Sequence, residues 1–177
     1  ISIAEPSKKQ RDFISNKFKP ENTYSDYKEL DENEKYDTVV AFQVFEHIRE
    51  PLEFANKICR NLKEGGLLIL EMPSAEDPLL TLYDIEEFKR FYFQKQHIFI
   101  HSVNSLRFLK ENSDFGGINF IRYQRYSLDN HLSWLLNRKR SDYKEQFSFL
   151  SKSAREAYND SLVKKGISDT IVAIFEK

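Results

Sequence analysis

The 177-residue sequence is poor in several features that would assign it to a particular class of protein. Its single cysteine, Cys59, excludes an internal disulfide and a metal site made of cysteines alone, and suits a reducing cytoplasm, where we expect the chain. No apolar run approaches the ~20 residues of a membrane span, and no signal peptide is visible. Lysine and arginine (27) balance aspartate and glutamate (28), so we expect neither nucleic acid nor a membrane as a partner.

Methionine is also scarce, because Met72 is the only one and the chain begins at Ile1. We therefore expect a processed N-terminus or a piece of a longer protein. Apolar residues, in contrast, are plentiful: 40% of the chain is hydrophobic and 14% aromatic, which is typical of a folded globule. A chain of this length fits one domain with a sizeable core. The sequence leaves a homo-oligomer open.

The first half of the sequence alternates predicted strands and helices. Residues 1–5 predict a short strand and are followed by a helix. Residues 36–45 form a nearly continuous apolar run, typical of a strand that is buried on both faces. An amphipathic helix then begins near Pro51, and residues 67–72 predict the next buried strand. Strand, helix and strand at this spacing indicate a mostly parallel α/β sheet.

The second half is richer in aromatic residues. Residues 77–96 predict a helix, Ser102 the cap of a shorter one, and residues 118–126 a strand. Ser153 has the position of the N-cap of a further helix, and residues 170–175 predict a final strand.

Three parts of this pattern resemble class I S-adenosylmethionine (SAM) dependent methyltransferases. Residues 36–47, Pro51 and residues 62–73, with Lys63-Glu64-Gly65-Gly66, are similar to their fourth strand, the helix after it and their fifth strand. Residues 3–6 resemble their second strand, and residues 169–173 their antiparallel last strand. His97 and the aromatic segment before it resemble the small-molecule branch that includes sugar and quinone methyltransferases.

The resemblance implies a Rossmann-like, doubly wound, mostly parallel sheet with an antiparallel C-terminal strand. Residues 1–177 would form one methyltransferase domain, partial at its N-terminus, in which residues 74–115 and 127–150 are insertions on the acceptor side. The family's first strand and its Gly-x-Gly-x-Gly turn, which bring the backbone close to the cofactor, would precede Glu5 and are missing. Because this strand is central, its absence would leave backbone groups unpaired. We expect an upstream segment or a partner chain to fill the gap.

SAM is the cofactor that the resemblance implies, bound at the carboxyl ends of the strands. Glu5 would accept hydrogen bonds from the ribose, although a surface acid at a helix N-terminus explains it as well. Asp26 and Tyr27 fall where adenine would lie, and a charged loop is the alternative. The expected cofactor-binding residues are Glu5, Pro6, Asp26, Tyr27, Phe42, Gln43, Val44 and His47.

The bend after residue 42 carries the strongest group of candidate site residues. Phe42 or Phe45 would face the sulfonium through a cation–π contact, with core packing as the alternative for Phe45. Gln43 would hold the methionine part of SAM, and Glu46 and His47 would orient the acceptor or cap the next helix. Some quinone methyltransferases bind a divalent ion here through two acids and a histidine. Because Gln43 replaces the first acid, we expect no metal.

A hydroxyl acceptor must lose a proton, and histidine is best suited to accept it near neutral pH. We rank His97 first and His47 second as this base, whereas His101 and His131 are expected to be structural. The expected acceptor-binding residues are Tyr83, Tyr92, Arg122 and Arg125. The acceptor is expected to be a small hydroxylated molecule such as a sugar or a surface-polysaccharide precursor.

Two other functions remain open. The missing glycine turn would also fit a catalytically inactive, methyltransferase-like interaction module. A nicotinamide-dependent oxidoreductase would share the acid at Glu5, but it would not explain Glu46-His47 or the last strand.

Overall fold

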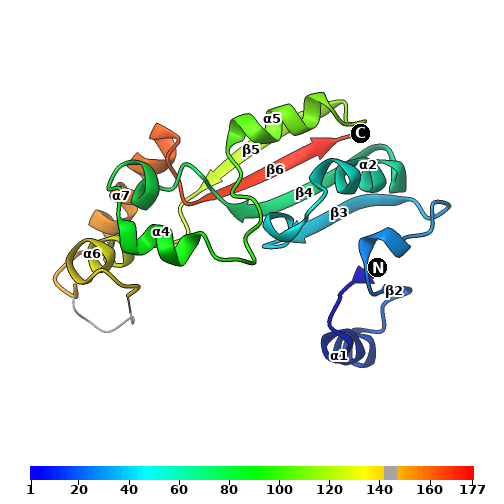
Figure 1. Ribbon diagram of the computed structural model, residues 1–177, viewed down its shortest axis with the longest axis horizontal. Coiled ribbons are helices and arrows are strands. Elements are labelled where there is room, and N and C mark those ends of the chain that lie inside the picture. The colour runs from blue at the N-terminus through cyan, green and yellow to red at the C-terminus, as the bar shows by residue number, and fades with distance from the viewer. Residues whose placement is uncertain (142–146) are drawn as a thin grey trace.

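The structure is a computed structural model that describes residues 1–141 and 147–177. Its strands form a two-stranded and a four-stranded sheet (Figure 1). In the smaller sheet, β1 (Ile3–Ala4) pairs in parallel with β2 (Thr23–Tyr24). The larger sheet has the order β3-β4-β6-β5. Its strands are β3 (Tyr36–Phe42), β4 (Leu62–Pro73), β5 (Gly117–Tyr123) and β6 (Thr170–Glu176).

Strand directions in the larger sheet follow the predicted pattern. β3 and β4 are parallel, and β6 is antiparallel to both of its neighbours, β4 and β5. β3, β4 and β5 therefore share one direction, and β6 is reversed between β4 and β5. The predicted fold class, a mostly parallel α/β sheet with an antiparallel C-terminal strand, is confirmed.

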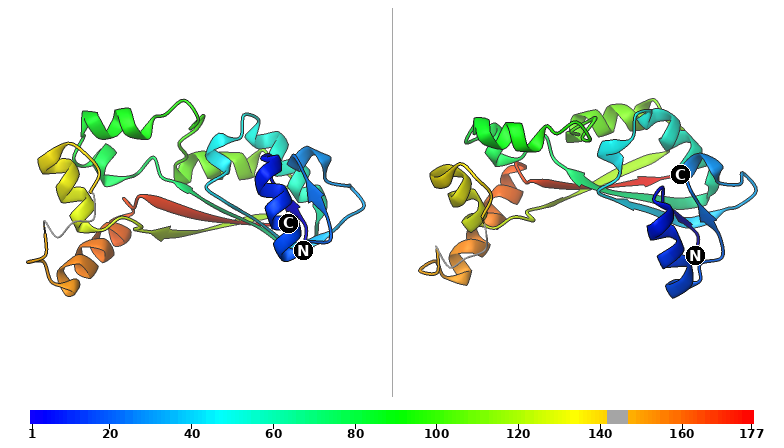
Figure 2. Two further views of the ribbon diagram at one scale, coloured as in Figure 1. Left: turned by 90° about the horizontal axis from the view of Figure 1, so that it is seen from below. Right: turned by 60° about the horizontal axis from the view of Figure 1, so that its bottom comes forward.

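The helices lie in two places around the larger sheet. They are α1 (Lys8–Phe18), α2 (Pro51–Asn61), α3 (Pro78–Thr81), α4 (Glu86–Tyr92), α5 (Val103–Glu111), α6 (Leu128–Asn137) and α7 (Lys152–Lys165), with short 3-10 turns η1 (Tyr27–Glu29) and η2 (Phe45–His47). α2 and α5 lie against one face of the sheet (Figure 2). α4, α6 and α7 gather beyond the end at which β4 finishes and β6 begins. No helix of residues 1–141 and 147–177 combines the length and apolar character needed to cross a membrane.

The main core lies between α2, α5 and the sheet. It follows from alternation along the strands, because Leu68, Leu70 and Met72 of β4 all point to the helix-covered face and are fully buried. The opposite face is more open at the outer strands, where Val40 and Phe42 of β3 and Ile121 of β5 are each more than half exposed. A second, smaller cluster joins α3, α4 and α6 around Phe88, Tyr92 and Trp134.

Two predicted helices differ from those in the structure. Residues 77–96 do not form one helix: α3 and α4 are separated by a turn in which Asp84 has a left-handed φ of 52°. A left-handed residue cannot continue a right-handed helix, so the chain breaks there. The N-cap of α7 is Ser151, whose side chain accepts a hydrogen bond from the Ala154 N–H, and not Ser153. The expected insertions stay a prediction, and residues 142–146 lie outside the described part of the second one.

Candidate functional site

A groove with a volume of about 550 Å³ runs between the β1–β2 sheet and the outer strand β3. Ile3 and Ala4 of β1 line one side, and residues 38–42 of β3 line the other. Five of the residues expected to bind the cofactor line this groove, namely Pro6, Asp26, Tyr27, Phe42 and Val44. They come from three separate places in the chain, so the fold, and not the sequence order, brings them together.

Glu5 lies beside this groove and not among its lining residues. Its Oε1 accepts a hydrogen bond from the Ser7 N–H at 2.7 Å, at the start of α1. Asp26 caps η1, because its Oδ1 accepts from the Lys28 N–H at 2.9 Å. Both carboxylates therefore already stabilise local turns, and each retains capacity to accept further hydrogen bonds.

The bend at Gln43 follows directly after β3. Gln43 has a left-handed φ of 55°, which costs a residue with a side chain about 1–2 kcal/mol. Two hydrogen bonds to Glu71 hold this conformation: the Gln43 N–H donates to the Glu71 carbonyl at 2.8 Å, and Gln43 Nε2 donates to Glu71 Oε1 at 3.2 Å. Phe45, two residues further on, is fully buried in the core, so Phe42 is the phenylalanine that reaches the groove.

A second hollow, with a volume of about 250 Å³, lies beyond the end of β4. Its walls come from α4, α6 and the segments next to β5 and β6. Gln43, His97, Tyr92 and Arg125 line it, together with the aromatic side chains of Phe88, Phe91 and Trp134. We call this hollow the aromatic cavity.

Two of the four residues expected to bind the acceptor, Tyr92 and Arg125, thus line the aromatic cavity. The other two are elsewhere. The Tyr83 hydroxyl lies 3.0 Å from the Tyr158 hydroxyl, and Arg122 Nη1 lies 2.6 Å from Glu76 Oε2 in an ion pair.

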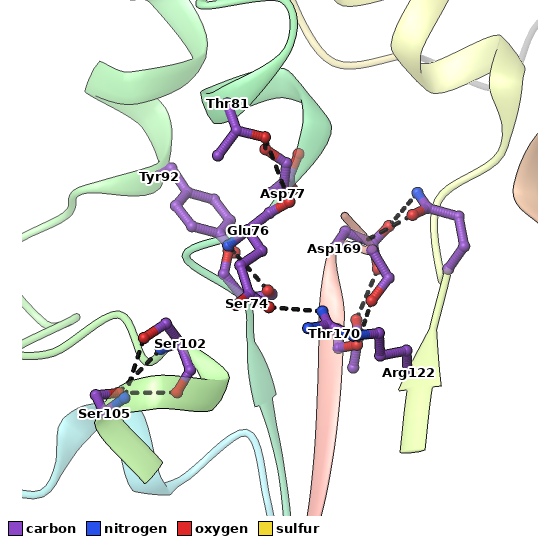
Figure 3. Close-up of polar contacts among 12 residues, drawn as sticks. Ser74, Glu76, Asp77, Thr81, Tyr92, Ser102, Ser105, Arg122, Asp169 and Thr170 are labelled. Atoms are coloured by element: carbon purple, nitrogen blue, oxygen red, sulfur yellow. Dashed lines mark hydrogen bonds and ion pairs between the residues drawn. The ribbon is translucent and has the colours of Figure 1, made fainter. Parts of the chain in front are cut away.

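Two buried aspartates that the sequence did not indicate as site residues, Asp77 and Asp169, also line the aromatic cavity. Figure 3 shows their polar contacts. Asp169, at the start of β6, accepts hydrogen bonds from the backbone N–H groups of Arg125 and Tyr126 and from Gln124 Nε2, and burial raises its pKa. Asp77 caps α3 through the Leu79 N–H at 2.7 Å, and burial raises its pKa to about 7. An aspartate before Pro78 is a recognisable helix start, but its burial cannot be read from the sequence.

The two predicted catalytic histidines lie together. His47 in η2 and His97 after α4 have ring centroids 5.3 Å apart. His47 Nδ1 lies 2.6 Å from the Gln96 carbonyl, and His97 Nδ1 lies 2.8 Å from the Tyr92 carbonyl. Because a carbonyl oxygen only accepts, each Nδ1 must carry the proton and each Nε2 has a free lone pair in the neutral ring.

Glu46 belongs to the same cluster. It is 1% exposed, and burial raises the pKa of its carboxyl group. Its Oε1 lies 3.8 Å from His47 Nε2. Its backbone carbonyl accepts hydrogen bonds from the N–H groups of Ile98 and Phe99, at 2.8 and 3.2 Å, so η2 and the segment after α4 are fixed to each other.

His101 and His131 have the surroundings of structural residues. The His101 ring stacks on Phe45 with centroids 4.8 Å apart, and His131 is fully buried with Nδ1 2.7 Å from the Tyr158 hydroxyl. Burial lowers the pKa of both rings to about 4, which keeps them neutral at physiological pH.

Comparisons with known proteins agree with this architecture. Residues 1–119 match the model of a family described as a methyltransferase domain. A SAM-dependent methyltransferase from Archaeoglobus fulgidus is 16% identical over 99% of this chain and 75% of its own, with a TM-score of 0.61. A SAM-dependent methyltransferase from Thermotoga maritima is described as a possible histamine N-methyltransferase. It is 18% identical, and the match covers 98% of this chain and 72% of that protein, with a TM-score of 0.62.

Phosphoethanolamine N-methyltransferase 2 from Haemonchus contortus, solved with SAM, is 16% identical over 94% of this chain and 39% of its own, with a TM-score of 0.53. A search of curated proteins finds no match. At these identities, the likeness to solved structures concerns the fold.

Proposed function

Because the chain belongs to the methyltransferase domain family, we propose that it transfers a methyl group from SAM to a small hydroxylated acceptor. The predicted family, the SAM-dependent methyltransferases, is confirmed by the family match to residues 1–119. The class of acceptor and the roles of individual residues are what the proposal adds.

The observation that carries the proposal is that residues 42–44 separate the two hollows. Phe42 and Val44 line the groove, and Gln43 between them lines the aromatic cavity. Methyl transfer from a sulfonium requires donor, methyl group and acceptor atom in one line, with the reacting atoms about 3–3.5 Å apart. Two hollows that are lined by consecutive residues of one bend support this arrangement.

The groove suits the donor. Its volume of about 550 Å³ lies within the range of roughly 300–1,000 Å³ that is usual for ligand sites. Phe42 is 56% exposed there, and its ring would attract the positive sulfonium through a cation–π contact. Asp26 on the groove and Glu5 beside it supply acceptors for the hydroxyl groups of a nucleoside.

The aromatic cavity suits the acceptor. A volume of about 250 Å³ restricts it to a small molecule or to one end of a larger one. Its lining combines aromatic side chains with many polar ones, among them Arg125 and Asp169, and this combination would fit a ring with hydroxyl groups, such as a sugar or a surface-polysaccharide precursor. His97 lines the same cavity, and its free Nε2 lone pair would accept the hydroxyl proton.

Isothermal titration calorimetry with SAM and S-adenosylhomocysteine on the full-length protein tests the donor site. We expect both to bind, and Phe42→Ala to weaken the binding of SAM by about fivefold, since a cation–π contact contributes roughly 1 kcal/mol. S-adenosylhomocysteine has no positive charge on its sulfur, so its binding should change less. Ile121→Ala is the matched control, because Ile121 is 54% exposed on the other outer strand and away from the groove. If neither ligand binds, the result would favour a catalytically inactive module. NADH is titrated in parallel, and binding of NADH alone would favour an oxidoreductase.

The acceptor class needs a separate assay. Release of S-adenosylhomocysteine should be measured with panels of hydroxylated and amine-bearing small molecules. Turnover with hydroxylated compounds supports the proposal, and turnover with amines alone would show that the acceptor class is wrong while the donor assignment stands.

A further inference from the structure

We propose that Glu46, His47 and His97 form a binding site for a divalent transition-metal ion such as Zn²⁺. Each residue contributes one ligand atom, and these atoms lie within 4.8 Å of one another. Two imidazoles and one carboxylate are a donor set that Zn²⁺ and its neighbours in the first transition row prefer, whereas Mg²⁺ and Ca²⁺ prefer oxygen ligands alone.

The two imidazole rings are already in the tautomer that binds a metal ion. Each has its Nδ1–H directed at a backbone carbonyl, that of Gln96 for His47 and that of Tyr92 for His97. Metal-binding histidines generally donate their second N–H to a carbonyl or carboxylate, which fixes the ring and leaves Nε2 to the ion. In the neutral rings, both Nε2 atoms are therefore available as ligands.

The Glu46 carboxylate gives an independent indication of a missing ligand. Glu46 is 1% exposed, and within residues 1–141 and 147–177 its Oε2 has no hydrogen-bond partner. A buried polar atom without a partner destabilises the protein, so native structures rarely keep one. A cation between this carboxylate and the two Nε2 atoms would satisfy it.

The backbone holds the three residues at nearly the required spacing. Ligand atoms at about 2.0–2.2 Å from Zn²⁺ lie roughly 3.3–3.6 Å apart in a tetrahedral site. The observed atoms lie within 4.8 Å of one another, so the most distant pair needs to approach by at most about 1.5 Å. The hydrogen bonds from Ile98 and Phe99 to the Glu46 carbonyl keep the two backbone segments together.

Three protein ligands leave a fourth coordination position open. His97 lines the aromatic cavity, so an acceptor molecule there would be next to the ion. With the ion bound, the Nε2 lone pair of His97 is occupied, and the ion replaces the histidine as the group that promotes loss of the acceptor proton. The metal site itself does not depend on the proposed acceptor.

The sequence argued against a metal because Gln43 stands where an acid would be needed. The structure places a different third ligand at the bend: Gln43 binds Glu71, and His97 arrives from the segment after α4. A contact between segments so far apart in the sequence cannot be read from the spacing of residues 43–47.

The test is calorimetry of the full-length protein with Zn²⁺, after treatment with a chelator, and an absorption spectrum of the Co²⁺-loaded protein. We expect one ion per chain and the d–d bands of a site with nitrogen ligands. Glu46→Gln, His47→Gln and His97→Gln should each weaken Zn²⁺ binding by more than about tenfold. Glu50→Gln, an exposed acid on the same segment, is the control that should leave the affinity unchanged.

Absence of stoichiometric Zn²⁺ binding, or equal affinity in wild type and all three variants, would overturn the proposal. Circular dichroism of each variant separates loss of the ligand from loss of the fold. SAM titrations on the same preparations keep the outcomes apart, because a protein that binds SAM but no Zn²⁺ would refute the metal site and leave the methyltransferase assignment intact.

Discussion

The imidazole rings of His47 and His97 lie 5.3 Å apart, although one belongs to the bend after β3 and the other follows α4. This contact joins the strand end that lines the groove to the segment that lines the aromatic cavity. A change at His97 should therefore affect the acceptor side without disturbing the donor side, and this separation can be measured.

We expect His97→Gln to lower turnover by about a hundredfold or more, the usual contribution of a general base or of the metal that would replace it. The affinity for SAM should stay within about twofold, because His97 does not line the groove. Calorimetry and the rate of S-adenosylhomocysteine release measure the two quantities. Lys95→Ala, an exposed change in the same segment, is the control. Unchanged turnover in His97→Gln would remove this residue from catalysis.

Much of the fold could be predicted because its signals are local. The strand β3, the amphipathic stripe of α2 and the cap at Ser102 each depend on neighbours in the sequence, and each is found in the structure. The expected burial of β3 on both faces is wrong, because β3 is an outer strand on which Val40 and Phe42 are more than half exposed. The break at Asp84 could not be predicted, because no glycine or proline marks it and the left-handed conformation depends on its surroundings.

The candidate site could be predicted only in part, because contacts between side chains from distant segments depend on the fold and not on neighbours in the sequence. Residues 42–44 were expected at a site because strand ends in parallel sheets bind ligands, and in the structure they line the two hollows. The role expected for Tyr83 rested on its place in the aromatic segment, and that of Arg122 on its place in a predicted strand. The structure gives each a specific partner away from the cavity, Tyr158 and Glu76. Alternation along a strand indicates which face a side chain is on, but not which side chain it meets there.

The raised pKa of Asp77 predicts a measurable loss of stability as the pH rises. Its pKa is raised from 3.8 to about 7 in the folded state, so between these values the unfolded chain releases a proton that the folded chain retains. The free energy of unfolding therefore falls as the pH rises from about 4 to about 7, by up to roughly 4 kcal/mol. Asp77→Asn keeps an oxygen for the Leu79 N–H and removes the charge.

We expect Asp77→Asn to be more stable than wild type near pH 8, and the difference to shrink toward about pH 4.5. Urea unfolding across this pH range measures it. Parallel stability curves for the two proteins would show that the Asp77 carboxyl group titrates normally.

His101 predicts the opposite pH dependence. Burial lowers the pKa of the His101 ring from 6.5 to about 4 in the folded state. Between these two pH values, the ring is protonated in the unfolded chain and neutral in the folded chain. Stability therefore falls as the pH drops from about 6.5 to about 4, by up to roughly 3 kcal/mol from this residue. Its Nε2 is buried and has no hydrogen-bond partner within the described residues. Because its ring stacks on Phe45, phenylalanine should fit in its place.

His101→Phe should therefore change stability by no more than about 1 kcal/mol at pH 7 and make the protein more resistant to acid. The comparison is best made in the Asp77→Asn background, where the opposing titration of Asp77 is absent. Equal loss of stability between about pH 6.5 and about pH 4.5 with and without His101→Phe would contradict the assignment.

The ion pair between Arg155 of α7 and Asp129 of α6 should stabilise the helices beyond the sheet. Arg155 Nε and Nη2 donate to the two Asp129 oxygens at 2.5 and 2.8 Å, and both side chains are less than a third exposed. The guanidinium also donates to the carbonyls of Phe147 and Leu150. Lysine keeps the charge but cannot make this planar, two-pronged contact.

We therefore expect Arg155→Lys to lower the free energy of unfolding by about 1–2 kcal/mol. Lys152→Ala is the matched control, because Lys152 pairs with Glu156 on the same helix but both side chains are largely exposed, and its loss should cost less than about 0.5 kcal/mol. Urea unfolding of both variants measures the difference. Since α6 contributes Asn130 and Trp134 to the wall of the aromatic cavity, Arg155→Lys should also weaken acceptor binding while SAM affinity is kept. Equal stability of the two variants would mean that charge alone, and not the two-pronged geometry, holds α7 against α6.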